Sequence, residues 1–125
     1  MTDDELVNAF EAGTLQEFTH ESHVRAAWYY LRRDPILVAL QRFRAALQRF
    51  AAGKGQASRY HETITVAFML LIADRLGRAR ELSWNDFAAR NPDLLRRHPS
   101  ALSEFYPDDV IASEEARRGF VLPPA

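Results

Sequence analysis

Apolar residues recur at intervals of three and four along most of this chain, and glycine or proline interrupts each such stretch. One example is the series Ile36, Leu40, Phe43, Leu47 and Phe50. This spacing places apolar side chains on one side of a helix, which then packs against other helices. No segment shows the strict alternation between hairpin turns that is typical of strands. The pattern therefore predicts an all-helical fold without a sheet.

Capping residues and breakers divide the chain into four longer helices. The expected N-caps are Thr2 for a first helix that ends at Gly13, Thr19 for 20–32, Asp34 for 35–52 and Ser58 for 59–76. Short connections make successive helices antiparallel, so the second and fourth helices should run parallel. We therefore expect an up-down bundle of about four helices.

The last third of the chain, from about Ser83, is more broken. Pro92, Pro99 and Ser113 each restart a short helical stretch. Its apolar residues are Trp84, Phe87, Leu94, Leu95, Leu102, Phe105 and Tyr106. This composition predicts a segment of short helices wrapped on the bundle. The length of 125 residues is typical of a single domain, so we expect one helical domain that spans residues 1–125.

Charge and composition narrow the class of partner. The net charge is -1, from 16 basic and 17 acidic residues, which argues against binding to nucleic-acid backbones. There is no cysteine, so thiolate metal sites are excluded. The longest apolar run, 66–73, is too short to span a bilayer. The acidic start lacks the pattern of a signal peptide, and we expect a cytoplasmic protein.

Three histidines are the most function-like feature of the sequence. His20 and His23 lie three residues apart, which places them on one face of a helix. His61 shares a stripe with Ile64 and Phe68, which is expected to face inward. Parallel second and fourth helices have their N-termini at the same end of a bundle. The sequence therefore predicts that the three imidazoles meet there.

Three converging imidazoles have the chemistry of a metal site. A helix N-terminus disfavours protonated histidine, and the neutral ring is the form that binds metal. Three nitrogen ligands also leave one position open, as in catalytic sites. We therefore expect a small helical metalloprotein that holds Zn, Fe, Ni or Cu, with a catalytic role left open. Glu62 or Glu11 is a candidate fourth ligand, and Tyr60 and Thr63 are candidates for hydrogen bonds that orient the ligands.

Three other interpretations stay open. The histidines can be core residues whose ring nitrogens are satisfied within the protein. Alternatively, the chain is a binding module for an anionic small molecule, because two helix N-termini at one place attract an anion, and Arg25 or Arg59 would add charge. A third possibility is an interaction protein that docks a protein partner on its C-terminal third. Arg96 and Arg97 are expected to be solvated charges.

Three stretches of the sequence resemble a known family. They are FTHESHVRAAW at 18–28, RYHETIT at 59–65 and EARRGFV at 115–121. Together they resemble a family of short uncharacterised bacterial helical proteins, and the likeness covers most of the chain. The resemblance implies a bacterial origin and a stand-alone domain. That family has no established activity, so the resemblance implies no catalytic residues.

Overall fold

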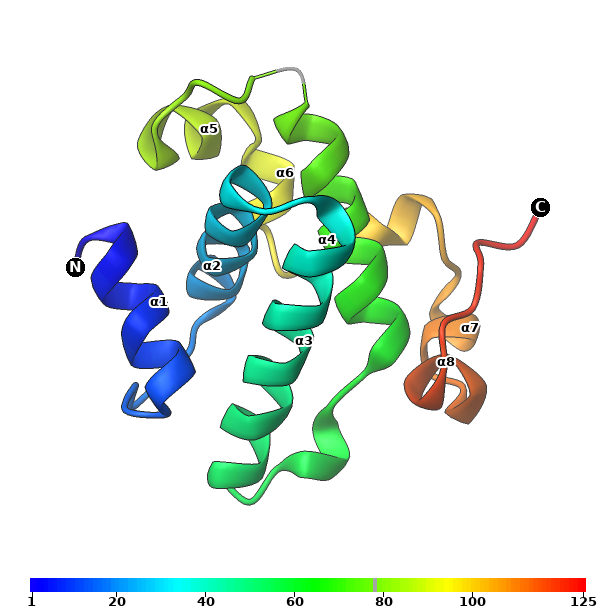
Figure 1. Ribbon diagram of the computed structural model, residues 1–125. Helices are drawn as coiled ribbons and strands as arrows, with labels where there is room; N and C mark the ends of the chain where they lie inside the picture. Colours follow the sequence, from blue (N-terminus) through cyan, green and yellow to red (C-terminus); the bar gives the residue numbers. More distant parts are fainter. Residues whose placement is uncertain (78) are drawn as a thin grey trace.

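The computed structural model describes residues 1–77 and 79–125, and these residues form helices and no strand. The four longer helices are α1 (Asp3–Ala12), α2 (His20–Arg33), α3 (Ile36–Gly53) and α4 (Glu62–Leu76) (Figure 1). The shorter ones are η1 (Ala57–Arg59), α5 (Trp84–Arg90), α6 (Pro92–Leu95), η2 (Ala101–Glu104), α7 (Asp108–Ile111) and α8 (Glu114–Arg118). No helix in this part of the chain has the length and apolar character of a bilayer span.

The first two helices begin as their caps predict. The Thr2 hydroxyl accepts the Glu5 N–H at 3.1 Å, and the Glu5 carboxylate accepts the Thr2 N–H at 2.8 Å, which completes a capping box. The Thr19 hydroxyl accepts the Ser22 N–H at the start of α2. Gly13 ends α1 with a φ of 73°, a left-handed conformation that glycine adopts without a steric cost.

The expected starts of α3 and α4 are wrong by a few residues. Asp34 closes α2 instead of capping α3, and its carboxylate accepts a hydrogen bond from Arg42 at 3.0 Å. Ser58 lies in the separate turn η1, and α4 begins only at Glu62 with His61 as its N-cap. At both starts, the side chains of Asp34 and His61 are held by contacts outside the local capping pattern, with Arg42 and with the Ile111 carbonyl.

Helix α2 lies at the centre of the packing and contacts α1, α3, α4 and α6. In Figure 1, α2 and α4 both run upward, whereas α3, which connects them in the sequence, runs downward. The N-termini of α2 and α4 therefore lie toward the same end of the molecule. The all-helical class is confirmed, but the structure does not confirm the finer prediction of a four-helix up-down bundle.

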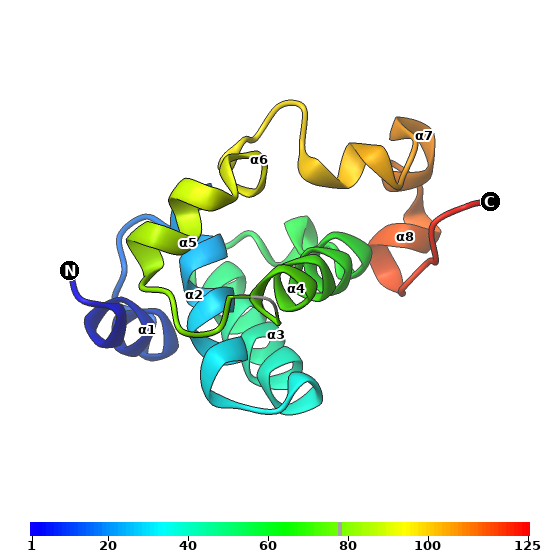
Figure 2. The same cartoon turned by 90° about the horizontal axis from the view of Figure 1, so that it is seen from above.

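The C-terminal third consists of short helices, as expected, and it extends along one side of the longer helices (Figure 2). Trp84, Phe87 and Leu94 are buried, and the Trp84 ring lies 5.6 Å from that of the fully buried Trp28. Burial of side chains of this size contributes roughly 1.5–3 kcal/mol each. This segment is therefore part of the hydrophobic core, and its Arg97 borders the site described next.

Candidate functional site

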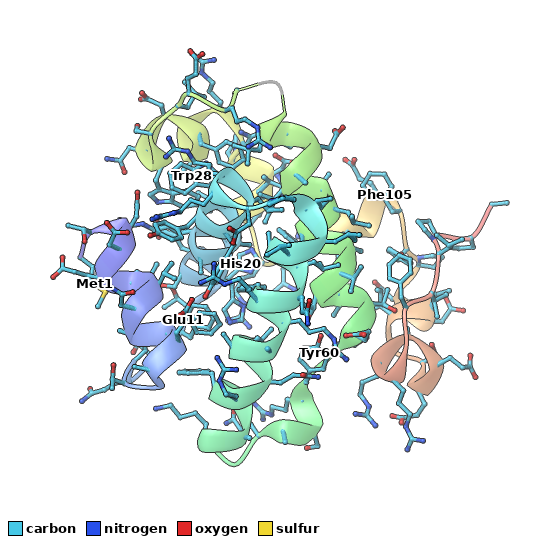
Figure 3. The ribbon with its side chains drawn as sticks, viewed as in Figure 1. Met1, Glu11, His20, Trp28, Tyr60 and Phe105 are labelled. Carbon is cyan, nitrogen blue, oxygen red and sulfur yellow. The ribbon has the colours of Figure 1, made fainter. Side chains whose placement is uncertain are left out.

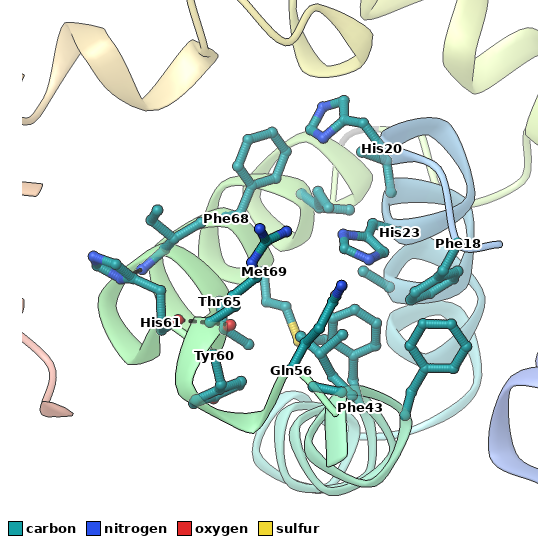
Figure 4. A pocket seen from close by; sticks show the side chains of 18 of the residues that line it. Phe18, His20, His23, Phe43, Gln56, Tyr60, His61, Thr65, Phe68 and Met69 are labelled. Atoms are coloured by element: carbon teal, nitrogen blue, oxygen red, sulfur yellow. Dashed lines mark hydrogen bonds between the residues drawn. The ribbon is translucent and has the colours of Figure 1, made fainter. Parts of the chain in front are cut away.

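A cavity of about 520 Å³ lies between α2, α3 and α4 (Figures 3 and 4). Most of its lining is apolar and includes Phe18, Val24, Phe43, Phe50, Phe68 and Met69. Its polar lining residues are His20, His23, Gln56, Arg59, Tyr60, His61, Thr65 and Arg97. All three predicted histidines therefore border one cavity, but they do not meet.

His20 and His23 lie on the same side of α2, as their spacing predicts. The Nε2 of His20 lies 2.9 Å from the Leu94 carbonyl oxygen, so this nitrogen carries the proton and donates to it. His23 is half-buried and packs edge-on against Phe18, with 4.0 Å between ring centroids. Burial, together with the nearby His20 and Arg97, lowers the pKa of His23 to about 4, so its ring is neutral near pH 7.

His61 has a different role from the predicted one. Its Nδ1 accepts the Ile64 N–H at 3.0 Å and so caps α4. Its Nε2 lies 2.8 Å from the Ile111 carbonyl oxygen and donates a hydrogen bond to it. Both ring nitrogens are therefore occupied, and Figure 4 shows the ring on the far side of Phe68 and Met69 from His23.

The prediction of a three-histidine metal site is wrong. Within residues 1–77 and 79–125, no group of three or more histidine, aspartate or glutamate side chains is arranged to hold a metal ion. The physical reason is that a ligating nitrogen needs a free lone pair, and His61 uses its only lone pair to cap α4. The sequence placed His61 in the first helical turn, whereas it lies just before it.

The two carboxylates considered as a fourth ligand are bound elsewhere. Glu62 accepts hydrogen bonds from Arg44 at 2.7 Å and from Tyr60 at 2.5 Å. Burial alone would raise the pKa of Glu62, but these two donors outweigh it and lower that pKa. Glu11 accepts the Tyr30 hydroxyl at 2.5 Å on the other side of α2. Neither glutamate lines the cavity.

Tyr60 and Thr63 do not orient the histidines either. Burial and the Glu62 carboxylate raise the pKa of Tyr60 to about 12, so its hydroxyl stays protonated and donates to Glu62. Thr63 is fully buried, and its hydroxyl donates to the Gly119 carbonyl at 2.9 Å and accepts the Val121 N–H at 3.0 Å. Thr63 therefore holds the C-terminal segment against α4.

Of the two arginines proposed for an anion, only Arg59 lies at the cavity. Arg25 forms an ion pair with Asp3 at 2.6 Å and donates to the Met1 carbonyl. Arg59 and Arg97 both line the cavity and are exposed, and their side chains make no ion pair or hydrogen bond with the residues that the structure describes. Sequence reasoning missed Arg97, because it follows α6 and no local pattern places it beside α2.

No protein-family model, curated protein or solved structure matches this chain. The resemblance to a family of short bacterial proteins therefore stays a prediction. The chemistry of the cavity itself is the basis for a functional interpretation.

Proposed function

We propose that this protein binds a small amphipathic anion, a molecule with an apolar body and one acidic head group. The observation that carries the proposal is the lining of the cavity. Apolar walls are combined with Arg59 and Arg97, which have no partner among residues 1–77 and 79–125, and the lining residues within these ranges include no aspartate or glutamate. This is the anionic small-molecule interpretation from the sequence, with Arg97 in place of Arg25.

The size and walls of the cavity suit the apolar body of such a ligand. A volume of about 520 Å³ lies within the range of roughly 300–1,000 Å³ that is usual for small-molecule sites. Phe43 and Met69 are buried and contribute to the wall, and Phe68 is half-buried. Methionine is flexible and adapts to ligands of different shape. An aromatic and an aliphatic ligand would therefore both be stabilised by transfer of their apolar part from water into the cavity.

The charges favour an acidic head at the solvent-exposed part of the cavity. Arg59 and Arg97 are exposed, so an anion between them keeps some hydration while it accepts charge-assisted hydrogen bonds. No carboxylate among the lining residues competes for the guanidinium groups. A neutral ligand of the same shape would gain the apolar contacts but not these bonds.

Calorimetric titration of the purified protein with 2-naphthoate and with its neutral analogue 2-naphthamide tests the proposal. We expect 2-naphthoate to bind roughly tenfold more tightly, the effect of about 1.4 kcal/mol from charge-assisted hydrogen bonds. The double variant Arg59→Gln, Arg97→Gln should lose this preference. Arg90→Gln, which removes an exposed charge on α5 that does not line the cavity, should keep it.

Two results would contradict the proposal. One is an equal affinity of the wild-type protein for the acid and the amide, and the other is no binding of either. Loss of the preference in Arg90→Gln as well would show that only the overall charge of the protein matters.

A further inference from the structure

Hydrogen-bonding groups inside the cavity are mostly used within the protein itself. The Thr65 hydroxyl donates to the His61 carbonyl at 2.8 Å, and the Tyr60 hydroxyl donates to Glu62. His61 uses both of its ring nitrogens, and His20 uses one. These side chains therefore contribute little to the recognition of a ligand.

His23 is the exception among the polar residues that line the cavity. It is half-buried, and neither of its ring nitrogens has a hydrogen-bond partner among the residues that the structure describes. Figure 4 shows its ring directed from α2 into the space toward α4. Arg59, Arg97 and Gln56 also lack partners, but all three are exposed to water.

A half-buried imidazole without partners in the described part of the protein gives up some of its contact with water. A leucine or phenylalanine would fill the same position beside Phe18 without that loss. The ring nitrogens of His23 are not sealed off, so they are available to a polar group of a ligand that displaces water from the cavity.

We propose that His23 determines specificity, and that the ligand carries a second, uncharged polar group that hydrogen-bonds to it inside the cavity. This proposal rests on the proposed function and adds a chemical class to it. The ligand is a hydroxylated or oxo-substituted amphipathic acid, and not a plain hydrocarbon acid. A neutral imidazole offers one N–H donor and one acceptor, so it accommodates either a hydroxyl or a carbonyl group.

The charged and titratable groups around His23 agree with an uncharged partner. His20 on α2 and Arg97 after α6 both disfavour a proton on His23. No aspartate or glutamate lines the cavity to stabilise an imidazolium ion. The acidic head group therefore has its counter-ions at Arg59 and Arg97, and His23 is left for a neutral group.

The test is a titration of the wild-type protein with 2-naphthoate and with a set of hydroxylated 2-naphthoates that differ in the position of the hydroxyl group. We expect at least one isomer to bind roughly 3- to 10-fold more tightly than the parent acid, as one net hydrogen bond provides. In His23→Phe this advantage over 2-naphthoate, with both ligands measured on the same variant, should disappear. His23→Gln, which keeps a donor and an acceptor, should retain part of the advantage.

The outcomes separate this proposal from the proposed function. If 2-naphthoate binds but no hydroxylated isomer binds more tightly, the role of His23 is wrong and the proposed function stands. An advantage that persists in His23→Phe also overturns the role of His23. If no member of the series binds to the wild-type protein, both proposals fail.

Discussion

His23 shows how a single half-buried side chain links the cavity to the stability of the protein. Its pKa is about 4 in the folded state, whereas an unfolded chain has a histidine pKa near 6.5. As the pH falls, the unfolded state therefore binds this proton first. The stabilisation is complete above about pH 6.5 and is lost as the pH falls toward 4.

We expect the free energy of unfolding of the wild-type protein to fall by on the order of 2–3 kcal/mol more than that of His23→Gln between pH 7 and pH 4. Urea unfolding of both proteins at several pH values measures this difference. His20 and Arg97, which face His23, are present in both proteins, so their own contributions to the free energy of unfolding cancel in the comparison. Parallel pH profiles would show that His23 is solvated in the folded state.

At the same scale, the three predicted histidines border one cavity, but the predicted metal chemistry is wrong. The spacing of His20 and His23 correctly predicted a shared inner face. The cap of α4 was not predictable, because helix statistics favour Ser58 over His61 as an N-cap. The decisive contact is with the Ile111 carbonyl, 50 residues away, and no local pattern indicates it.

At the scale of helices, the joint between α4 and the C-terminal segment depends on Thr63. Its buried hydroxyl satisfies both the Gly119 carbonyl and the Val121 N–H. Thr63→Val keeps the shape and removes both hydrogen bonds, so we expect a loss of about 1–3 kcal/mol in stability. Amide hydrogen exchange at Val121 should become faster.

Thr65→Val is the matched control for this change. The Thr65 hydroxyl bonds to the carbonyl of His61, the N-cap of its own helix, and makes no hydrogen bond to the described residues of the C-terminal segment. Loss of this hydroxyl should therefore leave exchange at Val121 unchanged. Exchange at Val121 that stays slow in Thr63→Val would show that apolar packing alone holds the C-terminal segment.

The helix boundaries were predictable where hydrogen bonds between residues close in the sequence determine them. Thr2, Thr19 and Ser113 all cap helices as the sequence indicates. The start of α3 was not predictable from local pattern. The carboxylate of Asp34 binds Arg42, which lies on α3, and so does not cap that helix. Local hydrogen bonding therefore explains the confirmed boundaries, and side-chain contacts across helices explain the shifted ones.

At the scale of the whole molecule, the cavity exists because segments far apart in the chain meet. Arg59 precedes α4 and Arg97 follows α6, yet both border the space beside His23. The apolar periodicity of the sequence predicts which helix faces are buried. It does not predict that their side chains leave a space between them, since this depends on the fit of many side chains at once.

The two methionines of the chain allow a direct test of binding in this cavity. Met69 is buried in the cavity wall, and Met1 is 69% exposed at the N-terminus and serves as an internal control. In protein labelled with carbon-13 in its methionine methyl groups, 2-naphthoate should shift the Met69 signal until the site is saturated and leave the Met1 signal in place. A titration in which 2-naphthoate binds by calorimetry while the Met69 signal does not move would contradict binding in the cavity.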